Sequence, residues 1–75
     1  MNVDQVLDAK GLACPMPIVK TKKAMNNLEA GQVLEVQTTD KGAKSDLTAW
    51  TKSTGHILLD SKEEENVFTF YIQKS

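Results

Sequence analysis

The sequence predicts an α/β fold of the α+β two-layer sandwich type, with a mixed four-stranded sheet and two helices on one face. The expected elements follow the order β-α-β-α-β-β, and the expected strands alternate apolar and polar residues. Such strands bury only one face of their sheet, so both helices are expected on that face. At 75 residues the chain is too short for two cores, which indicates a single domain, residues 1–75.

The first half of the chain is expected to form a strand and then a helix. The pattern predicts a strand over Val3–Ala9, closed by Gly11, and a helix over Pro17–Leu28, followed by Gly31. Apolar residues at offsets of three and seven return to one helical face. On the expected helix that face holds Ile18, Met25 and Leu28.

A second strand and helix follow. Gln32–Thr39 alternates between the two faces of a strand, with Leu34, Val36 and Thr38 on one of them. Asp40-Lys41-Gly42 has turn chemistry, and Ala43–Thr54 has helical spacing at Ala43, Leu47, Trp50 and Thr54. Ser45 is a candidate cap for this helix, and Gly55 ends it.

Two further strands complete the pattern. They are expected over His56–Ser61 and Val67–Gln73, joined by a charged turn at Lys62–Asn66. In the last strand Phe68, Phe70 and Ile72 share one face. Crossover helices imply parallel pairing of the strands that flank them, whereas the final two strands are expected to pair as an antiparallel hairpin.

Composition excludes several classes of function. All nine basic residues are lysine, and with a formal net charge of −1 a dedicated nucleic-acid surface is not expected. The single cysteine excludes an intrachain disulfide and a multi-cysteine zinc site, so no metal or cofactor is expected.

An unpaired thiol suits a reducing compartment. Asp4 and Asp8 do not fit a signal peptide, and the apolar stretch Leu12–Val19 is too short for a membrane span. The expected location is the cytoplasm.

The segment Gly11–Pro17 departs from ordinary loop composition. Pro15 and Pro17 stand where a helix must begin, the one place where proline costs a helix little. The helix therefore starts either at Pro15, with Cys14 as its cap, or at Pro17, with Cys14 in the approach. Both alternatives put Cys14 within about one turn of the helix N-terminus, where partial positive charge favours the thiolate.

Cys14 allows two interpretations. A lone cysteine is commonly a small buried hydrophobe. The flanking prolines and the loop-to-helix position instead favour a nucleophile on a rigid mount. A Cys–His hydrolase would require the fold to bring the distant His56 to Cys14, and so small a chain has little room for a substrate pocket.

The order and spacing of several motifs resemble the TusA/SirA-like sulfur carrier family. The core of the resemblance is Cys14-Pro15-Met16-Pro17 after Gly11-Leu12. Further matches extend over essentially the whole chain: Leu7-Asp8, Lys22-Lys23-Ala24, Thr39-Asp40, Asp46 and Gly55-His56. The resemblance implies the β-α-β-α-β-β sandwich and a sulfurtransferase that carries sulfur as a persulfide on Cys14. It also implies a donor protein, such as a cysteine desulfurase or a rhodanese-like protein, and an acceptor protein.

Other residues also allow two interpretations. Lys20, the nearest of three lysines to Cys14, either supports the thiolate or, with Lys22 and Lys23, forms a solvated helix face. Pro15, Met16 and Pro17 would support the sulfur, with Met16 exposed beside it. Roles in the architecture are expected for the remaining candidates: Asp40 and Asp46 at a turn and helix start, Trp50 in the core, and His56 at a strand start. The alternatives are a polar wall beside the site for the two aspartates and an exposed docking aromatic for Trp50.

Two other functional classes compete with the sulfur carrier. One is a non-enzymatic protein-interaction or redox-responsive regulatory module, in which Cys14 is incidental or senses oxidation. The other is a small RNA-binding sandwich, which the absence of arginine disfavours. The chain is expected to act as a monomer without membrane contact.

Overall fold

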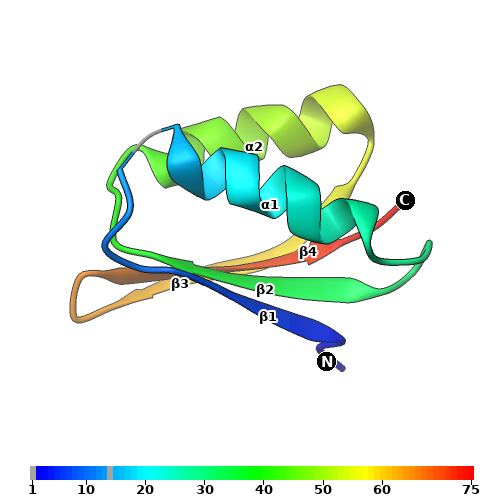
Figure 1. Ribbon diagram of the computed structural model, residues 1–75, viewed down its shortest axis with the longest axis horizontal. Helices are drawn as coiled ribbons and strands as arrows, with labels where there is room; N and C mark the ends of the chain where they lie inside the picture. The colour runs from blue at the N-terminus through cyan, green and yellow to red at the C-terminus, as the bar shows by residue number, and fades with distance from the viewer. Residues whose placement is uncertain (1, 14) are drawn as a thin grey trace.

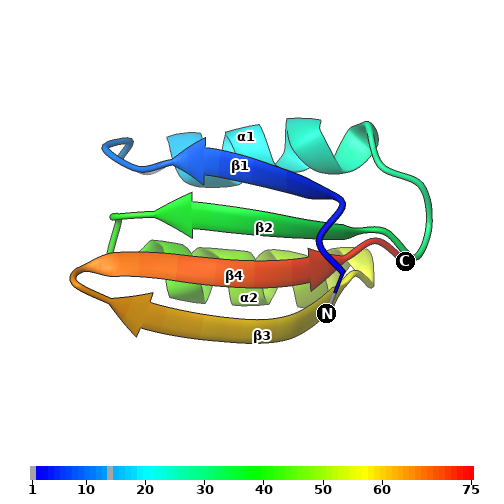
Figure 2. The ribbon, with the colours of Figure 1, turned by 90° about the horizontal axis from the view of Figure 1, so that it is seen from below.

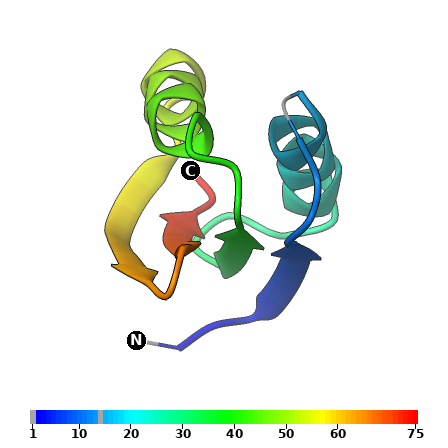
Figure 3. The same ribbon diagram turned by 90° about the vertical axis from the view of Figure 1, so that its left-hand side faces the viewer.

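The computed structural model describes residues 2–13 and 15–75 and contains the elements in the predicted order. These are β1 (Gln5–Ala9), α1 (Met16–Asn26), β2 (Val33–Thr38), α2 (Ala43–Thr54), β3 (Ile57–Glu64) and β4 (Val67–Gln73). Figures 1 and 3 show two layers, with both helices on the same face of the sheet. The predicted fold class is confirmed.

The strand order in the sheet is β1-β2-β4-β3, which Figure 2 shows from the face without helices. β1 pairs with β2 in parallel, and β4 pairs antiparallel with both β2 and β3. The expected parallel pairing of β2 with β3 is therefore wrong, because β4 lies between them. The central place suits β4, which buries Phe70 and Ile72. The charged and bulged β3 suits an edge.

The core lies between the sheet and the helices. Its largest fully buried side chains come from both layers: Met25, Leu34, Val36, Leu47, Phe70 and Ile72. The predicted alternation in β2 and β4 is confirmed, since Leu34, Val36 and Ile72 have no exposed surface. Trp50 is half-buried and packs against this core, but Thr54 is exposed, and Thr51 takes the buried position on that face of α2.

Several predicted boundaries differ from the structure. β3 continues to Glu64, so the charged turn shrinks from Lys62–Asn66 to the two residues Glu65 and Asn66. Ser45 lies inside α2 and is not its cap, because the N-cap residue is Gly42. Gly55 ends α2 as expected, in the left-handed conformation with φ of 86°.

Candidate functional site

The loops that follow β1 and β2 lie at the same end of the sheet. The two strands run parallel and their last paired residues are Ala9 and Thr38, so both chains leave the sheet side by side. Two residues after Ala9 and one after Thr38, the amide of Gly11 donates a hydrogen bond of 3.0 Å to the Thr39 hydroxyl. Gly11 has φ of 80°, which non-glycine residues rarely adopt. This hydrogen bond joins the β1–α1 loop to the β2–α2 loop.

Helix α1 begins between the two starts that the sequence allowed. Its first helical residue is Met16, Pro15 is the N-cap, and Pro17 is the second helical residue. Neither proline has an N–H, and both stand in a turn whose N–H groups have no helical partner. The first hydrogen bond of the helix runs from the Val19 amide to the Pro15 carbonyl, at 3.1 Å.

Cys14 immediately precedes the N-cap residue in the chain, and its own placement lies outside the described residues. The alternative that made Cys14 the cap is wrong, because Pro15 holds that position. The first turn of α1 carries no acidic residue that would oppose the positive end of the helix dipole. The helix start therefore favours an anionic group at its N-terminus.

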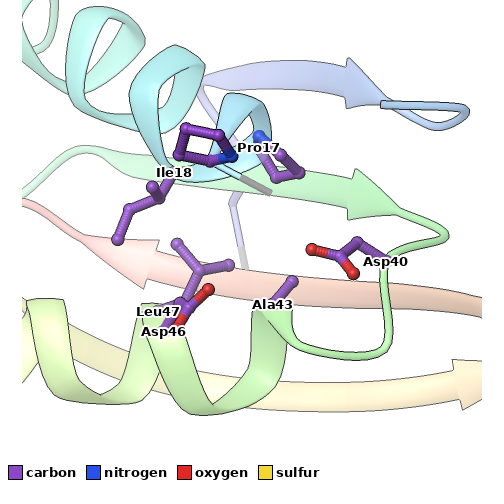
Figure 4. A pocket seen from close by; sticks show the side chains of 7 residues that line it. Pro17, Ile18, Asp40, Ala43, Asp46 and Leu47 are labelled. Atoms are coloured by element: carbon purple, nitrogen blue, oxygen red, sulfur yellow. The ribbon is translucent and has the colours of Figure 1, made fainter. Parts of the chain in front are cut away.

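A shallow depression lies beside this helix start, between α1 and α2 (Figure 4). The atom-free space in it is about 170 Å³, a volume that includes open solvent. The depression is too narrow to enclose a water molecule. It is lined by Pro15, Pro17, Ile18, Asp40, Ala43, Asp46 and Leu47. The lining is mostly apolar and comes from both helices and from the β2–α2 loop. Such a surface has no room for a substrate, but its lining includes Pro15, the residue that follows Cys14 in the chain.

Two carboxylates belong to the depression. Oδ1 of Asp40 accepts a hydrogen bond of 3.2 Å from the Gly42 amide, so the expected turn role of Asp40 is present. Oδ2 of Asp40 is buried and has no hydrogen-bond partner among the residues that the structure describes. Asp46 lies in the first turn of α2, where a negative charge complements the helix dipole. The two residues thus combine architectural roles with a polar wall beside the helix start.

The other predicted site residues are spread along α1. Pro15 is exposed, Met16 is 42% exposed, as expected, and Pro17 is buried. Lys20 is exposed and does not line the depression, and Lys22 and Lys23 are also exposed. The structure therefore gathers the prolines with the aspartates and leaves the lysines on an open helix face.

His56 lies far from the depression. It follows the C-terminal end of α2, whereas Ala43 at the start of α2 lines the depression. Twelve helical residues span about 18 Å, so the structure does not bring His56 to this site. Among residues 2–13 and 15–75 no group of His, Cys, Asp and Glu could hold a metal ion.

Sequence reasoning missed the role of Thr39 and the apolar wall made by Ile18, Ala43 and Leu47. Thr39 carried a signal, because it directly follows the strand that pairs with β1, but its partner Gly11 is 28 residues away. Ala43 and Leu47 were predicted only to share one face of the second helix. Their second role depends on how α2 packs beside α1, which the helical pattern alone does not reveal.

Comparison with known proteins identifies the family. The family model described as sulfurtransferase TusA matches residues 5–74. The chain belongs to the TusA family. It is 69% identical over 74 residues to YrkI of Bacillus subtilis, a protein named as a candidate sulfur carrier, with 99% of each chain covered. It is 51% identical to the sulfur carrier protein TusA of Allochromatium vinosum, over 99% of this chain and 97% of that one.

The fold agrees with a solved structure. A SirA-like protein from Desulfitobacterium hafniense superimposes with a TM-score of 0.82 at 28% identity, covering 92% of this chain and 95% of the other. Together these findings show a TusA-family sulfur carrier and confirm the family expected from Cys14-Pro15-Met16-Pro17. Membership of the TusA family also implies partners in a sulfur relay. In the described part of the chain no helix has the length and apolar character to span a membrane.

Proposed function

We propose that this TusA-family chain accepts sulfane sulfur as a persulfide on Cys14 and passes it to an acceptor protein. The observation that carries the proposal is the position of the single cysteine directly before the proline N-cap of α1. The positive end of the helix stabilises a thiolate and also a persulfide anion there. The sulfur donor is a cysteine desulfurase or a rhodanese-like protein. The carrier works as a monomeric single domain in the cytoplasm.

Loading is a displacement at sulfur. The Cys14 thiolate attacks the outer sulfur of the donor's persulfide, a new S–S bond forms, and the donor's own S–S bond breaks. The donor leaves as a thiolate, which takes up the proton that the Cys14 thiol released. Delivery repeats the displacement with an acceptor's nucleophile attacking the terminal sulfur. Neither step needs an outside oxidant or reductant.

The shape of the surface favours delivery of sulfur to another protein over a reaction inside a pocket. The depression beside the helix start holds no water-sized space, and Pro15 and Met16 are exposed. The chain has no second cysteine that could displace the carried sulfur as an internal disulfide. The cargo therefore leaves only through an external nucleophile, and specificity comes from protein docking.

The test is loading followed by intact mass measurement. Incubation with a cysteine desulfurase and cysteine, or with a rhodanese and thiosulfate, should add one sulfur atom, which a reducing thiol removes. Cys14→Ser should abolish the gain and leave the unfolding midpoint nearly unchanged. A folded wild-type chain that gains no sulfur from either donor would overturn the proposal. Partner binding that persists in Cys14→Ala while loading is absent would then indicate the interaction module.

A further inference from the structure

The hydrogen bond between the Gly11 amide and the Thr39 hydroxyl lies just beyond the end of the β1–β2 ladder. The ladder closes at the pair Ala9 and Thr38, and the Gly11–Thr39 contact of 3.0 Å continues it with a side chain in place of a backbone carbonyl. Gly11 stands three residues before Cys14 in the chain. The contact therefore holds the start of the segment that carries the Cys14 thiol.

The other described hydrogen bonds of this segment are local. The Lys10 amide donates to Oδ1 of Asp8 at 3.0 Å, and the Leu12 amide donates to the Ala9 carbonyl at 3.3 Å. The Ala13 carbonyl accepts from the Met16 amide at 2.9 Å. Among the bonds that join described residues, only the one to Thr39 links positions 10–13 to a distant element.

Thr39 is itself held in a defined position. The residue before it, Thr38, is fully buried, and its hydroxyl accepts a hydrogen bond of 3.1 Å from the Asp40 amide. The Asp40 carboxylate accepts from the Gly42 amide, and the Asp40 carbonyl accepts from the Ala43 amide at 3.1 Å. This turn leads directly into α2. Thr39 thus connects the thiol-bearing segment to a braced turn anchored in the sheet and in α2.

We propose that Thr39 is a positioning residue for sulfur transfer, which holds the Cys14 segment against the β2–α2 loop through the Gly11 amide. The inference rests on the proposed persulfide function of Cys14. A nucleophile on a loop reacts efficiently only when neighbouring contacts restrict its orientation. The prolines restrict the chain on the helix side of Cys14, and the Gly11–Thr39 bond restricts it on the strand side. Thr39 is exposed, so its role does not depend on core packing.

Two substitutions of Thr39 and one control separate positioning from general stability. Thr39→Val keeps the shape of the side chain but removes the acceptor, and Thr39→Ser restores a hydroxyl. Thr54→Val is the matched control, because Thr54 is also exposed and its hydroxyl donates to the Trp50 carbonyl at the other end of α2. Three quantities are measured: amide hydrogen exchange at Gly11, the sulfur loading rate, and the pH profile of Cys14 alkylation.

The expected pattern is specific to Thr39→Val. Exchange at Gly11 becomes faster and loading slower, each by about fivefold, the effect of losing one hydrogen bond. The midpoint of the alkylation profile moves to higher pH, because the thiolate is held less firmly at the positive helix end. Thr39→Ser returns all three quantities toward wild type, and Thr54→Val leaves them unchanged. Thr39→Val and Thr54→Val should lower the unfolding midpoint to a similar, modest extent, because each removes one exposed side-chain hydrogen bond.

Two results would overturn the inference. One is Gly11 exchange that Thr39→Val does not alter, which means that the bond does not protect the amide in solution. The other is faster exchange with unchanged loading and alkylation, which reduces Thr39 to a structural residue. A wild-type chain that takes up no sulfur disproves the proposed function instead. The alkylation profiles of the Thr39 variants then still decide whether Thr39 positions the Cys14 thiol.

Discussion

The indole ring of Trp50 packs against the imidazole of His56, with ring centroids 5.2 Å apart and planes inclined by 52°. Nδ1 of His56 accepts a hydrogen bond of 3.1 Å from the Ser75 amide, which requires that nitrogen to be unprotonated. Partial burial, followed by the positive charge of Lys74, lowers the pKa of His56 below its ordinary value of 6.5. The only histidine thus packs against the C-terminal part of α2.

The lowered pKa of His56 predicts a small pH dependence of stability. Below about pH 6.5 the unfolded chain binds the proton more readily than the folded chain, so stability falls as the pH drops through this range and returns as the pH rises. Urea unfolding at several pH values between about 5 and 8 should show this slope, and His56→Gln should flatten it. An identical slope in wild type and variant would contradict the prediction.

We predict that the Asp40 carboxylate destabilises the folded protein. Within residues 2–13 and 15–75 its buried Oδ2 atom has no hydrogen-bond partner, while Oδ1 accepts from the Gly42 amide. Asp40→Asn keeps an oxygen for Gly42 and replaces the buried anionic oxygen by a neutral NH2 group, which costs less to bury without a partner. The free energy of unfolding at neutral pH should therefore rise by about 1 kcal/mol. Asp40→Ala, which also loses the contact with Gly42, is the comparison and should be less stable than Asp40→Asn. Destabilisation by Asp40→Asn would mean that Oδ2 is satisfied in solution.

Gly11 and Gly42 form a matched pair for testing backbone strain at the site. A Cβ at Gly11 would meet no atom within 4 Å, but φ of 80° is unfavourable for alanine. Gly11→Ala should therefore destabilise the protein by about 1–2 kcal/mol, through the backbone alone. Gly42 has φ of −77°, and its nearest contact for a Cβ is Oδ1 of Asp40 at 3.7 Å. Gly42→Ala should be neutral or stabilising by up to about 1 kcal/mol. Equal effects in denaturant unfolding would contradict the strain argument.

The loop of the hairpin between β3 and β4 lacks the residues that its turn type favours. This two-residue loop, Glu65 and Asn66, has φ of 50° and 66°, and both are positive, as in a type I′ turn. Such turns favour Asn followed by Gly, so Asn66→Gly should stabilise the protein by about 0.5–1 kcal/mol, and Glu65→Asn should add to it. Thermal unfolding measures the gain. A lower melting temperature for Asn66→Gly would show that the turn conformation differs in solution.

The periodicity of the sequence predicted the helices and strands, but it did not predict which strands are neighbours in the sheet. Phe70 and Ile72 on β4 and Leu34 and Val36 on β2 were expected to be buried, because alternation reports which side chains share a face. The same alternation does not tell which strand lies beside which. The insertion of β4 between β2 and β3 depends on long-range packing, which local patterns do not contain.

The candidate site was likewise predictable only in part from the sequence. Pro15 and Pro17 located the helix start to within one residue, because proline has only one favourable place in a helix. The Gly11–Thr39 bond could not be predicted, because it joins two loops that meet only after the sheet forms. The burial of Asp40 Oδ2 could not be predicted either, because it depends on tertiary packing. Ser45 was a wrong cap because serine is common at several positions of a helix start, and Gly42 occupies the cap.

The parallel pairing of β1 with β2 places the helix starts at one pole of the molecule, and Figure 1 shows both chain ends at the opposite pole. A tether joined to either end would therefore leave the pole of α1 unobstructed. Immobilised on a bead through its C-terminus, the carrier should still exchange cargo with proteins in solution.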